Sequence, residues 1–221
     1  MNRDAELFRL LSWLSPSFPI GAFAYSHGLE RAIHDGAIKD RTSLLGWLSA
    51  LIACGSGWND AVLLAEAWRT AGIDGGTAVT ELAEAMAGSR ERHMETTLQG
   101  GAFMETVVAW GPIFPNGAKN ADSIPYPVAI GLAAARHGVG LHPALTAYLH
   151  AFASNLVQAT VRLVPLGQRD GVATLAALEP VIMSVAKQAA TSTLDDLGSC
   201  TIMSEIASMK HETQYSRVFR S

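Results

Sequence analysis

Seven histidines are the residues of this chain with the greatest capacity for metal chemistry. His137, His142 and His150 lie fairly near one another, but no two histidines have the His-Glu-x-x-His spacing of a helical metal site. Neither cysteine lies beside a histidine at a spacing typical of zinc ligands. We therefore predict ordinary surface or core histidines, no metal-binding residue and no cofactor held by the chain.

The sequence also lacks the usual arrangements of catalytic residues. It has no Gly-x-x-x-x-Gly-Lys-Ser/Thr phosphate loop and no Gly-x-Ser-x-Gly nucleophile elbow. Asp195 and Asp196 are consecutive, so their side chains diverge, and they are more typical of a helix cap than of an acid–base pair. Glu91 and Glu95 lie near two arginines, which predicts an ion-pair face in contact with solvent. We predict no catalytic residue and no enzymatic activity.

A first interior segment of interest, residues 15–30, contains two prolines and a glycine that interrupt the helical pattern. Its second half contains Tyr25, His27 and Glu30. These three side chains could pack inside the fold or face a partner, and the sequence alone leaves both roles open.

A second segment of interest, residues 162–171, contains Arg162 and Gln168. A cation at the end of a long helix interacts favourably with the helix dipole, which is a structural explanation for Arg162. An exposed arginine beside Gln168 could instead reach a phosphate or a carboxylate of a partner.

The C-terminal tail, which we define as residues 209–221, mixes aromatic, cationic and amide side chains. Its members are Met209, Lys210, His211, Glu212, Thr213, Gln214, Tyr215, Ser216, Arg217, Val218, Phe219, Arg220 and Ser221. Aromatic residues and arginine are enriched in protein interfaces, whereas disordered tails are usually poor in aromatics. We therefore favour docking of the tail to a partner over packing on its own domain.

A helical tail would have two distinct faces. If residues 210–220 are helical, His211, Tyr215 and Phe219 share one face because they are spaced at i, i+4 and i+8. Arg217 and Arg220 then lie together on another face. This geometry predicts an amphipathic peptide with an aromatic and a basic stripe.

The elements that position these residues are predicted to be helices. Apolar residues recur with helical spacing along most of the chain, and the alternating β-branched runs of strands are absent. We predict an all-α fold, a single-domain bundle of about nine or ten helices over residues 1–208, followed by the tail. One helix is predicted to begin near Ala24. A longer helix over residues 90–110 contains Gly100 and Gly101, which indicates close helix packing or a kink.

Composition narrows the class of protein further. Of 221 residues, 49% are hydrophobic and 16% charged, and the net charge of −4 gives no reason to expect nucleic-acid binding. Cys54 and Cys200 are predicted to be buried free thiols in a reducing cytoplasm. We expect no signal peptide, because acids precede a short apolar run, and no apolar stretch of membrane-spanning length.

Three segments resemble motifs of the urease accessory protein UreF family. They are Ser15-Pro16 through Pro19-Ile20-Gly21 with Tyr25-Ser26-His27-Gly28-Leu29-Glu30, then Arg162-Leu163-Val164-Pro165-Leu166-Gly167-Gln168, and finally Met209 to Ser221. They occur in the family's order and span nearly the whole chain. Phe18, Ala22, Ala24 and His27 depart from the Leu, Gly, Ser and Gln expected in many members.

The resemblance implies a cytoplasmic, all-α homodimer that assists insertion of nickel into apo-urease without catalysing a reaction. It implies a complex with the accessory protein UreD (also called UreH) and the GTPase UreG. By this resemblance residues 211–221 contact UreD, and the dimer forms a platform for UreG. Tyr25, His27, Glu30, Arg162 and Gln168 become candidates for contact with UreG or for structural roles.

Two alternatives stay open at this point. The first is a factor that regulates GTP hydrolysis by UreG with an inserted arginine, for which Arg162 and Arg217 are the candidates. The second is a helical protein that binds nickel by itself, for which equilibrium dialysis is expected to show no stoichiometric binding.

Overall fold

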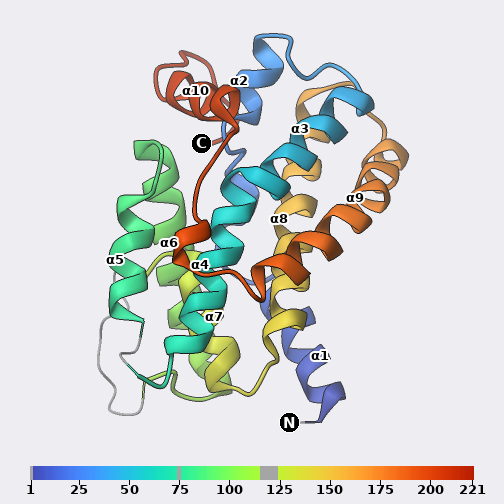
Figure 1. The fold of residues 1–221 in the computed structure, drawn as a ribbon. Coiled ribbons are helices and arrows are strands. Elements are labelled where there is room, and N and C mark those ends of the chain that lie inside the picture. The colour runs from blue at the N-terminus through green and yellow to red at the C-terminus, as the bar shows by residue number, and fades with distance from the viewer. Residues whose placement is uncertain (1, 74–75, 115–123) are drawn as a thin grey trace.

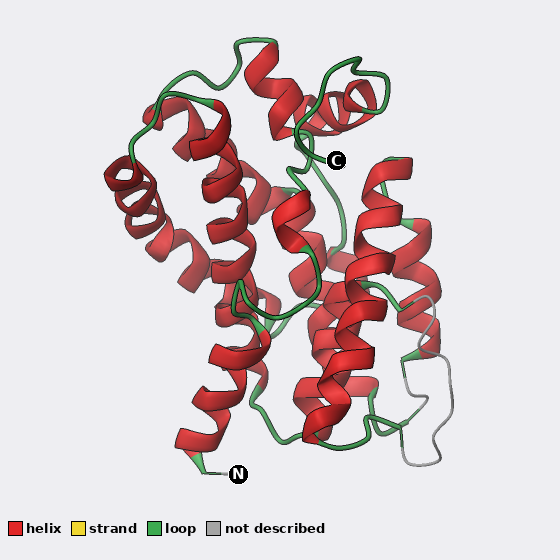
Figure 2. Ribbon diagram, turned by 180° about the vertical axis from the view of Figure 1, so that it is seen from behind, coloured by secondary structure: helices red, strands yellow, loops and turns green. Residues whose placement is uncertain are grey.

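The computed structural model describes residues 2–73, 76–114 and 124–221, and within these ranges it contains helices and loops without strands (Figure 2). The predicted all-α fold is therefore confirmed. The α-helices are α1 (Arg3–Trp13), α2 (Leu29–His34), α3 (Arg41–Cys54), α4 (Ser56–Thr70), α5 (Thr77–Ala85), α6 (Arg90–Val107), α7 (Tyr126–Arg136), α8 (Leu141–Leu163), α9 (Gln168–Ala189) and α10 (Ile202–His211). Short 3-10 helices lie between them: η1 (Ala22–Ala24) after α1, η2 (Val108–Trp110) after α6 and η4 (Leu194–Asp196) after α9.

The centre of the bundle is built on α7 and α4, which run side by side (Figure 1). Every residue of α7 from Pro127 to Ala134 is buried, as expected for a helix that is apolar on all sides. Gly131 permits the close approach, because a Cβ atom there would lie 2.4 Å from the carbonyl oxygen of Leu64 in α4. Around this pair, α6 covers α7, and α8 packs on α9.

Gly100, inside α6, marks close packing. An added Cβ atom at Gly100 would lie 1.7 Å from the carbonyl oxygen of Ile124. The helix continues through this position from Arg90 to Val107. Of the two explanations the sequence allows, the structure therefore supports close approach of the chain that leads into α7.

We expect Gly100→Ala to lower the free energy of unfolding by about 1–3 kcal/mol, because the methyl group overlaps a backbone atom that cannot rotate away. Urea unfolding measures the change. Gly46→Ala in α3 is the matched control, since nothing lies within 4 Å of its Cβ position. There the same change should raise stability by about 0.5–1 kcal/mol through helix propensity. Equal effects at the two positions would contradict the packing explanation.

The helix predicted to begin near Ala24 begins at Leu29 instead. Residues 22–24 form η1, and His27 and Gly28 then adopt left-handed backbone conformations with φ of 53° and 74°. Two consecutive residues of this kind cannot belong to an α-helix. At Gly28 a Cβ atom would lie 2.6 Å from the backbone nitrogen of Ser208, so this turn is the place where α10 meets the start of α2.

Two described stretches are long and apolar enough to cross a membrane when only length and composition are considered: residues 41–70, interrupted at Gly55 between α3 and α4, and Gln168–Ala189. Buried core helices pass the same test, and 56% of the first window is buried inside the bundle.

Candidate functional site

The tail folds back onto its own chain. Helix α10 ends at His211, so it crosses the 208/209 boundary predicted between bundle and tail, and the residues after it are not helical. The backbone N–H of Arg220 donates to the carbonyl oxygen of Ala24 at 2.8 Å, and that of Ser26 donates to a main-chain oxygen of Ser221 at 2.6 Å. The C-terminus therefore lies against the loop that leads into α2, below α10 in Figure 1.

The spacing of the aromatic residues fits a helical tail with an aromatic stripe, but the tail does not form such a helix in this structure. His211 is completely buried, Phe219 is 5% exposed, and Tyr215 between them is fully exposed. The chain turns after His211, so residues at i, i+4 and i+8 no longer share a face. The tail instead has an inner side that contacts the bundle and an outer side in solvent.

Glu30, in the first turn of α2, binds the backbone of the tail. Its Oε1 atom accepts from the N–H of Val218 at 2.7 Å, and its Oε2 atom accepts from the N–H of Phe219 at 2.9 Å. The Nε2 atom of His211 lies 3.3 Å from Oε2. Charge-assisted bonds of this kind are stronger than neutral ones. Because Glu30 is only 6% exposed, solvent screens them little.

Glu91, in the first turn of α6, contacts the side chains of two residues of the tail, His211 and Arg217. Its Oε2 atom lies 2.7 Å from Nδ1 of His211, and its Oε1 atom lies 2.5 Å from Nη1 of Arg217. Both ring nitrogens of His211 thus face carboxylate oxygens, one of Glu30 and one of Glu91. His211 joins α2 to α6 across the end of α10.

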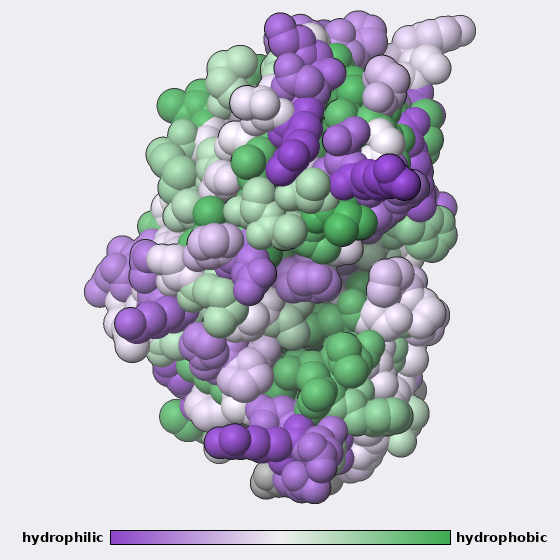
Figure 3. Space-filling view, turned by 90° about the vertical axis from the view of Figure 1, so that its right-hand side faces the viewer, coloured by the Kyte–Doolittle hydropathy of each residue, from purple (hydrophilic) through white to green (hydrophobic). Residues whose placement is uncertain are grey.

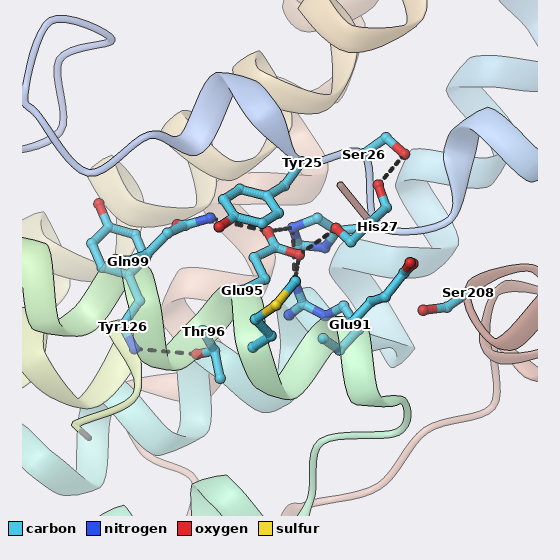
Figure 4. Close-up of polar contacts among 12 residues, drawn as sticks. Tyr25, Ser26, His27, Glu91, Glu95, Thr96, Gln99, Tyr126 and Ser208 are labelled. Carbon is cyan, nitrogen blue, oxygen red and sulfur yellow. Dashed lines mark hydrogen bonds and ion pairs between the residues drawn. The ribbon is translucent and has the colours of Figure 1, made fainter. Parts of the chain in front are cut away.

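Glu95 is one helical turn further along α6 and is 1% exposed. It lies 2.7 Å from Nε2 of His27 and 2.8 Å from Nη1 of Arg92, and it accepts from the hydroxyl of Ser221 at 2.8 Å. Figure 4 shows His27 and Glu95 facing each other beneath the loop that contains Tyr25 and Ser26. Burial raises the pKa of Glu95, but His27 and Arg92 outweigh it and hold the pKa at about 2.

The prediction that Glu91 and Glu95 form a solvated ion-pair face is therefore wrong. Both carboxylates are buried, since the start of α6 is covered by α10 and the tail. We call Glu30, Glu91 and Glu95 the carboxylate cluster. Its role in holding the tail was missed from sequence. The available signal was the i, i+4 spacing of the two acids of α6, which places them on one face.

A cavity of about 440 Å³ lies beside Glu95. The loop after α1, the first half of α6 and residues 148–162 of α8 form most of its walls. At its polar end Tyr148 donates to Asp60 at 2.8 Å, and Arg92 lies 3.8 Å from the same carboxylate. Burial raises the pKa of Asp60, partly opposed by Arg92. The cavity thus combines an apolar wall with a buried ionisable end.

The five candidate residues that precede the tail in sequence lie in three places. Tyr25, His27 and Glu30 are buried around the carboxylate cluster, with exposed fractions of 3%, 7% and 6%. Arg162 is exposed at the cavity, where its Nη1 atom donates to the carbonyl oxygen of Phe23 at 3.3 Å. Gln168 is exposed at the first turn of α9 and does not line the cavity. Contact of these residues with a partner stays a prediction.

Within residues 2–73, 76–114 and 124–221, no group of three or more histidine, cysteine, aspartate or glutamate side chains has an arrangement that could hold a metal ion. The carboxylate cluster contacts protein donors, namely backbone N–H groups, His27, Arg92, His211, Arg217 and Ser221. The chemistry this arrangement supports is capture of a peptide segment.

Comparison with known proteins gives a consistent result. The family model described as UreF matches residues 38–179. A urease accessory protein UreF of Mesorhizobium japonicum is 54% identical over 217 residues, which cover 97% of this chain and 96% of the relative. Urease accessory protein UreF 1 of Brucella canis is 54% identical over 97% of this chain and 94% of its own length. The UreF of Rhizobium leguminosarum bv. viciae is 52% identical over the full length of both.

Proposed function

The chain belongs to the UreF family of urease accessory proteins, and we propose that it is a non-enzymatic assembly factor for the nickel centre of urease. In this proposal it works in the cytoplasm in a complex with UreD (UreH), the GTPase UreG and apo-urease, and nickel is handled by the complex without a cofactor site in this chain. The family match over nearly the whole chain supports the role in urease maturation, and the tail supports the mode of assembly.

The two sides of the tail are the observation that carries this mode of assembly. The inner side is held by the carboxylate cluster through backbone N–H groups, His211 and Arg217. The outer side exposes Tyr215 fully and Val218 to 72%. Tyrosine and arginine at an exposed position are typical anchors of protein interfaces. We propose that the bundle presents residues 209–221 to UreD in this way.

Self-association is the second part of the proposed assembly. Leu7, Phe8 and Leu11 of α1 are 57%, 64% and 67% exposed and lie within one turn of each other. Apolar residues also gather on the lower half of the face drawn in Figure 3, the half in which α1 lies in Figure 1. Exposed apolar surface of this kind favours contact with another protein, and we propose that a second copy of the chain covers it.

Removal of the tail tests the function. We expect a chain that ends at Glu212, which keeps α10 and His211, to remain helical by circular dichroism and to lose co-purification with UreD and UreG.

The finer test is Tyr215→Ala. Since Tyr215 is fully exposed, its removal should leave the melting temperature unchanged and weaken binding to UreD at least about tenfold. If the chain that ends at Glu212 still assembles the complex and activates urease, the proposed role of the tail is wrong.

Regulation of GTP hydrolysis by UreG is the second candidate function, and the structure distinguishes its two arginines. Arg217 is already paired with Glu91 at 2.5 Å. Arg162 is exposed and donates to a neutral backbone carbonyl, so its positive charge is not neutralised by that contact. A guanidinium that stabilises the transition state of phosphoryl transfer must reach it with its charge available. Arg162 is therefore the better candidate.

If Arg162 acts on UreG, Arg162→Ala should remove the stimulation of GTP hydrolysis in the assembled complex. For a fully inserted arginine, the hydrolysis rate of UreG should fall by about a thousandfold. Single-turnover hydrolysis by UreG, with and without the variant, measures this. Arg217→Ala is the matched control and should leave the hydrolysis rate unchanged in whatever complex still forms. Equal rates with wild-type protein, with Arg162→Ala and without the protein exclude this function.

A further inference from the structure

The two cysteines, far apart in sequence, are neighbours in the fold. The backbone N–H of Cys200 donates to the carbonyl oxygen of Cys54 at 2.9 Å. Both are free thiols; Cys54 is half-buried and Cys200 is exposed, so the prediction that both are buried is wrong for Cys200 and holds only in part for Cys54. The hydrogen bond to the Cys200 thiol, followed by burial, raises the pKa of Cys54.

The chain around Cys200 is fixed against the junction of α3 and α4. We call residues 194–201 the strap. The indole N–H of Trp58 donates to the carbonyl oxygen of Asp196 at 2.8 Å, and the N–H of Gly198 donates to Asn59 at 2.9 Å. A Cβ atom at Gly55 would lie 2.7 Å from the hydroxyl of Thr201. Contacts on both sides of Cys200 therefore hold its backbone in place beside Cys54.

We propose that Cys54 and Cys200 form a reversible intramolecular disulfide through exchange with a low-molecular-weight disulfide. The N···O distance of 2.9 Å and standard bond lengths place the two Cα atoms no more than about 7 Å apart, which is the limit that a disulfide spans. Because the two thiol side chains also contact each other, we expect the bond to need rotation of the side chains rather than movement of the backbone. This site is independent of the role proposed in urease maturation.

The disulfide forms in two exchange steps, and Cys200 reacts first because it is the more exposed of the two thiols. The thiolate of Cys200 attacks one sulfur of the small disulfide, whose S–S bond breaks and releases one small thiolate. The thiolate of Cys54 then attacks the Cys200 sulfur of this mixed disulfide and releases the second small thiolate. Both protein thiols lose their protons and are oxidised together by two electrons, and the small disulfide is reduced to two thiols.

The disulfide would link the end of α3 to the strap, which leads directly into α10 and the tail. Because the cross-link closes a loop comprising most of the chain, it restricts the unfolded state strongly. The oxidised protein is expected to melt about 5–15 °C higher than the reduced protein. The amide of Cys200 should also exchange its hydrogen more slowly, since the strap can no longer separate from Cys54.

The test uses the full chain treated with glutathione disulfide and, in parallel, with dithiothreitol. Thiol titration should show loss of both thiols, and peptide mass mapping should show one cross-linked peptide pair that lacks two hydrogen atoms. The yield should not depend on protein concentration, because the bond is intramolecular. Two thiols that persist, or covalent dimers that increase with concentration, would overturn the proposal.

Single substitutions test the order of attack. Cys54→Ser should accumulate a glutathione adduct on Cys200, because no second thiol resolves it. Cys200→Ser should leave Cys54 as a thiol under the same conditions, since Cys54 is half-buried and burial still raises its pKa when the Cys200 thiol is absent. Neither variant should show the increase in melting temperature on oxidation. An equal increase in both variants would show that the stabilisation comes from another source.

Discussion

Replacement of Glu30 by alanine is expected to release the end of the tail and to lower the free energy of unfolding by about 3–5 kcal/mol. The substitution removes the acceptor of two backbone N–H groups, those of Val218 and Phe219, and one of the two carboxylates that face His211. His211 is completely buried and would keep only Glu91. Loss of one partner from a buried charged network costs more than the network contributes, because the remaining groups stay desolvated.

Hydrogen exchange provides the direct measurement, since the amides of Val218 and Phe219 donate to Glu30 itself. We expect both to lose protection in Glu30→Ala, while amides of α7 keep theirs. Glu30→Gln should have an intermediate effect, because the amide retains one oxygen acceptor without the charge. Glu179→Ala, at an exposed site of α9, is the control and should change stability by no more than about 0.5 kcal/mol. Unchanged protection of the tail amides in Glu30→Ala would contradict the assignment.

The same variant links stability to assembly. If the bundle must hold the inner side of the tail so that Tyr215 is presented outward, Glu30→Ala should weaken binding to UreD although it changes no exposed residue of the tail. If the tail instead leaves the bundle when UreD binds, the variant should bind UreD as tightly as the wild type or more tightly, because less work is needed to detach residues 212–221. The direction of the change therefore decides which arrangement of the tail UreD recognises.

The class of fold was predictable because it depends on local signals. Helical spacing of apolar residues sets each helix, and a helix such as α7, apolar on all sides, can only lie in the core. The start of α2 was not predictable, because it depends on the left-handed conformations of His27 and Gly28. Gly28 approaches the backbone of Ser208, a contact between residues far apart in sequence.

The tail shows the limit of periodicity more clearly. Its spacing fits an amphipathic helix, yet Glu30 captures two backbone N–H groups that a helix would have used internally. Likewise, the charges near the start of α6 resemble a solvated face until α10 covers them. In both cases a polar contact between residues far apart in sequence overrides a local preference. A single sequence does not show which distant residues come together in the fold.

Glu95 is expected to make folding depend strongly on pH in acid. Its pKa is about 2 in the folded protein against an ordinary value of 4.5. The stabilisation is therefore complete above about pH 5 and is lost as the pH falls toward 2, where the folded protein also binds the proton. The difference corresponds to about 3 kcal/mol. His27 and Arg92 are the cause, because their charges outweigh the effect of burial.

Urea unfolding of wild type and Glu95→Gln at several pH values between 7 and 2.5 measures this contribution. At pH 7 the variant should be less stable by about 3 kcal/mol, because His27 and Arg92 lose a charged partner in a buried site. The difference should shrink as the pH falls, since the wild-type carboxylate becomes neutral like the amide. Glu179→Gln should follow the wild-type curve throughout. A difference between wild type and Glu95→Gln that stays constant with pH would mean that Glu95 stabilises the fold by packing and hydrogen bonding rather than by its charge.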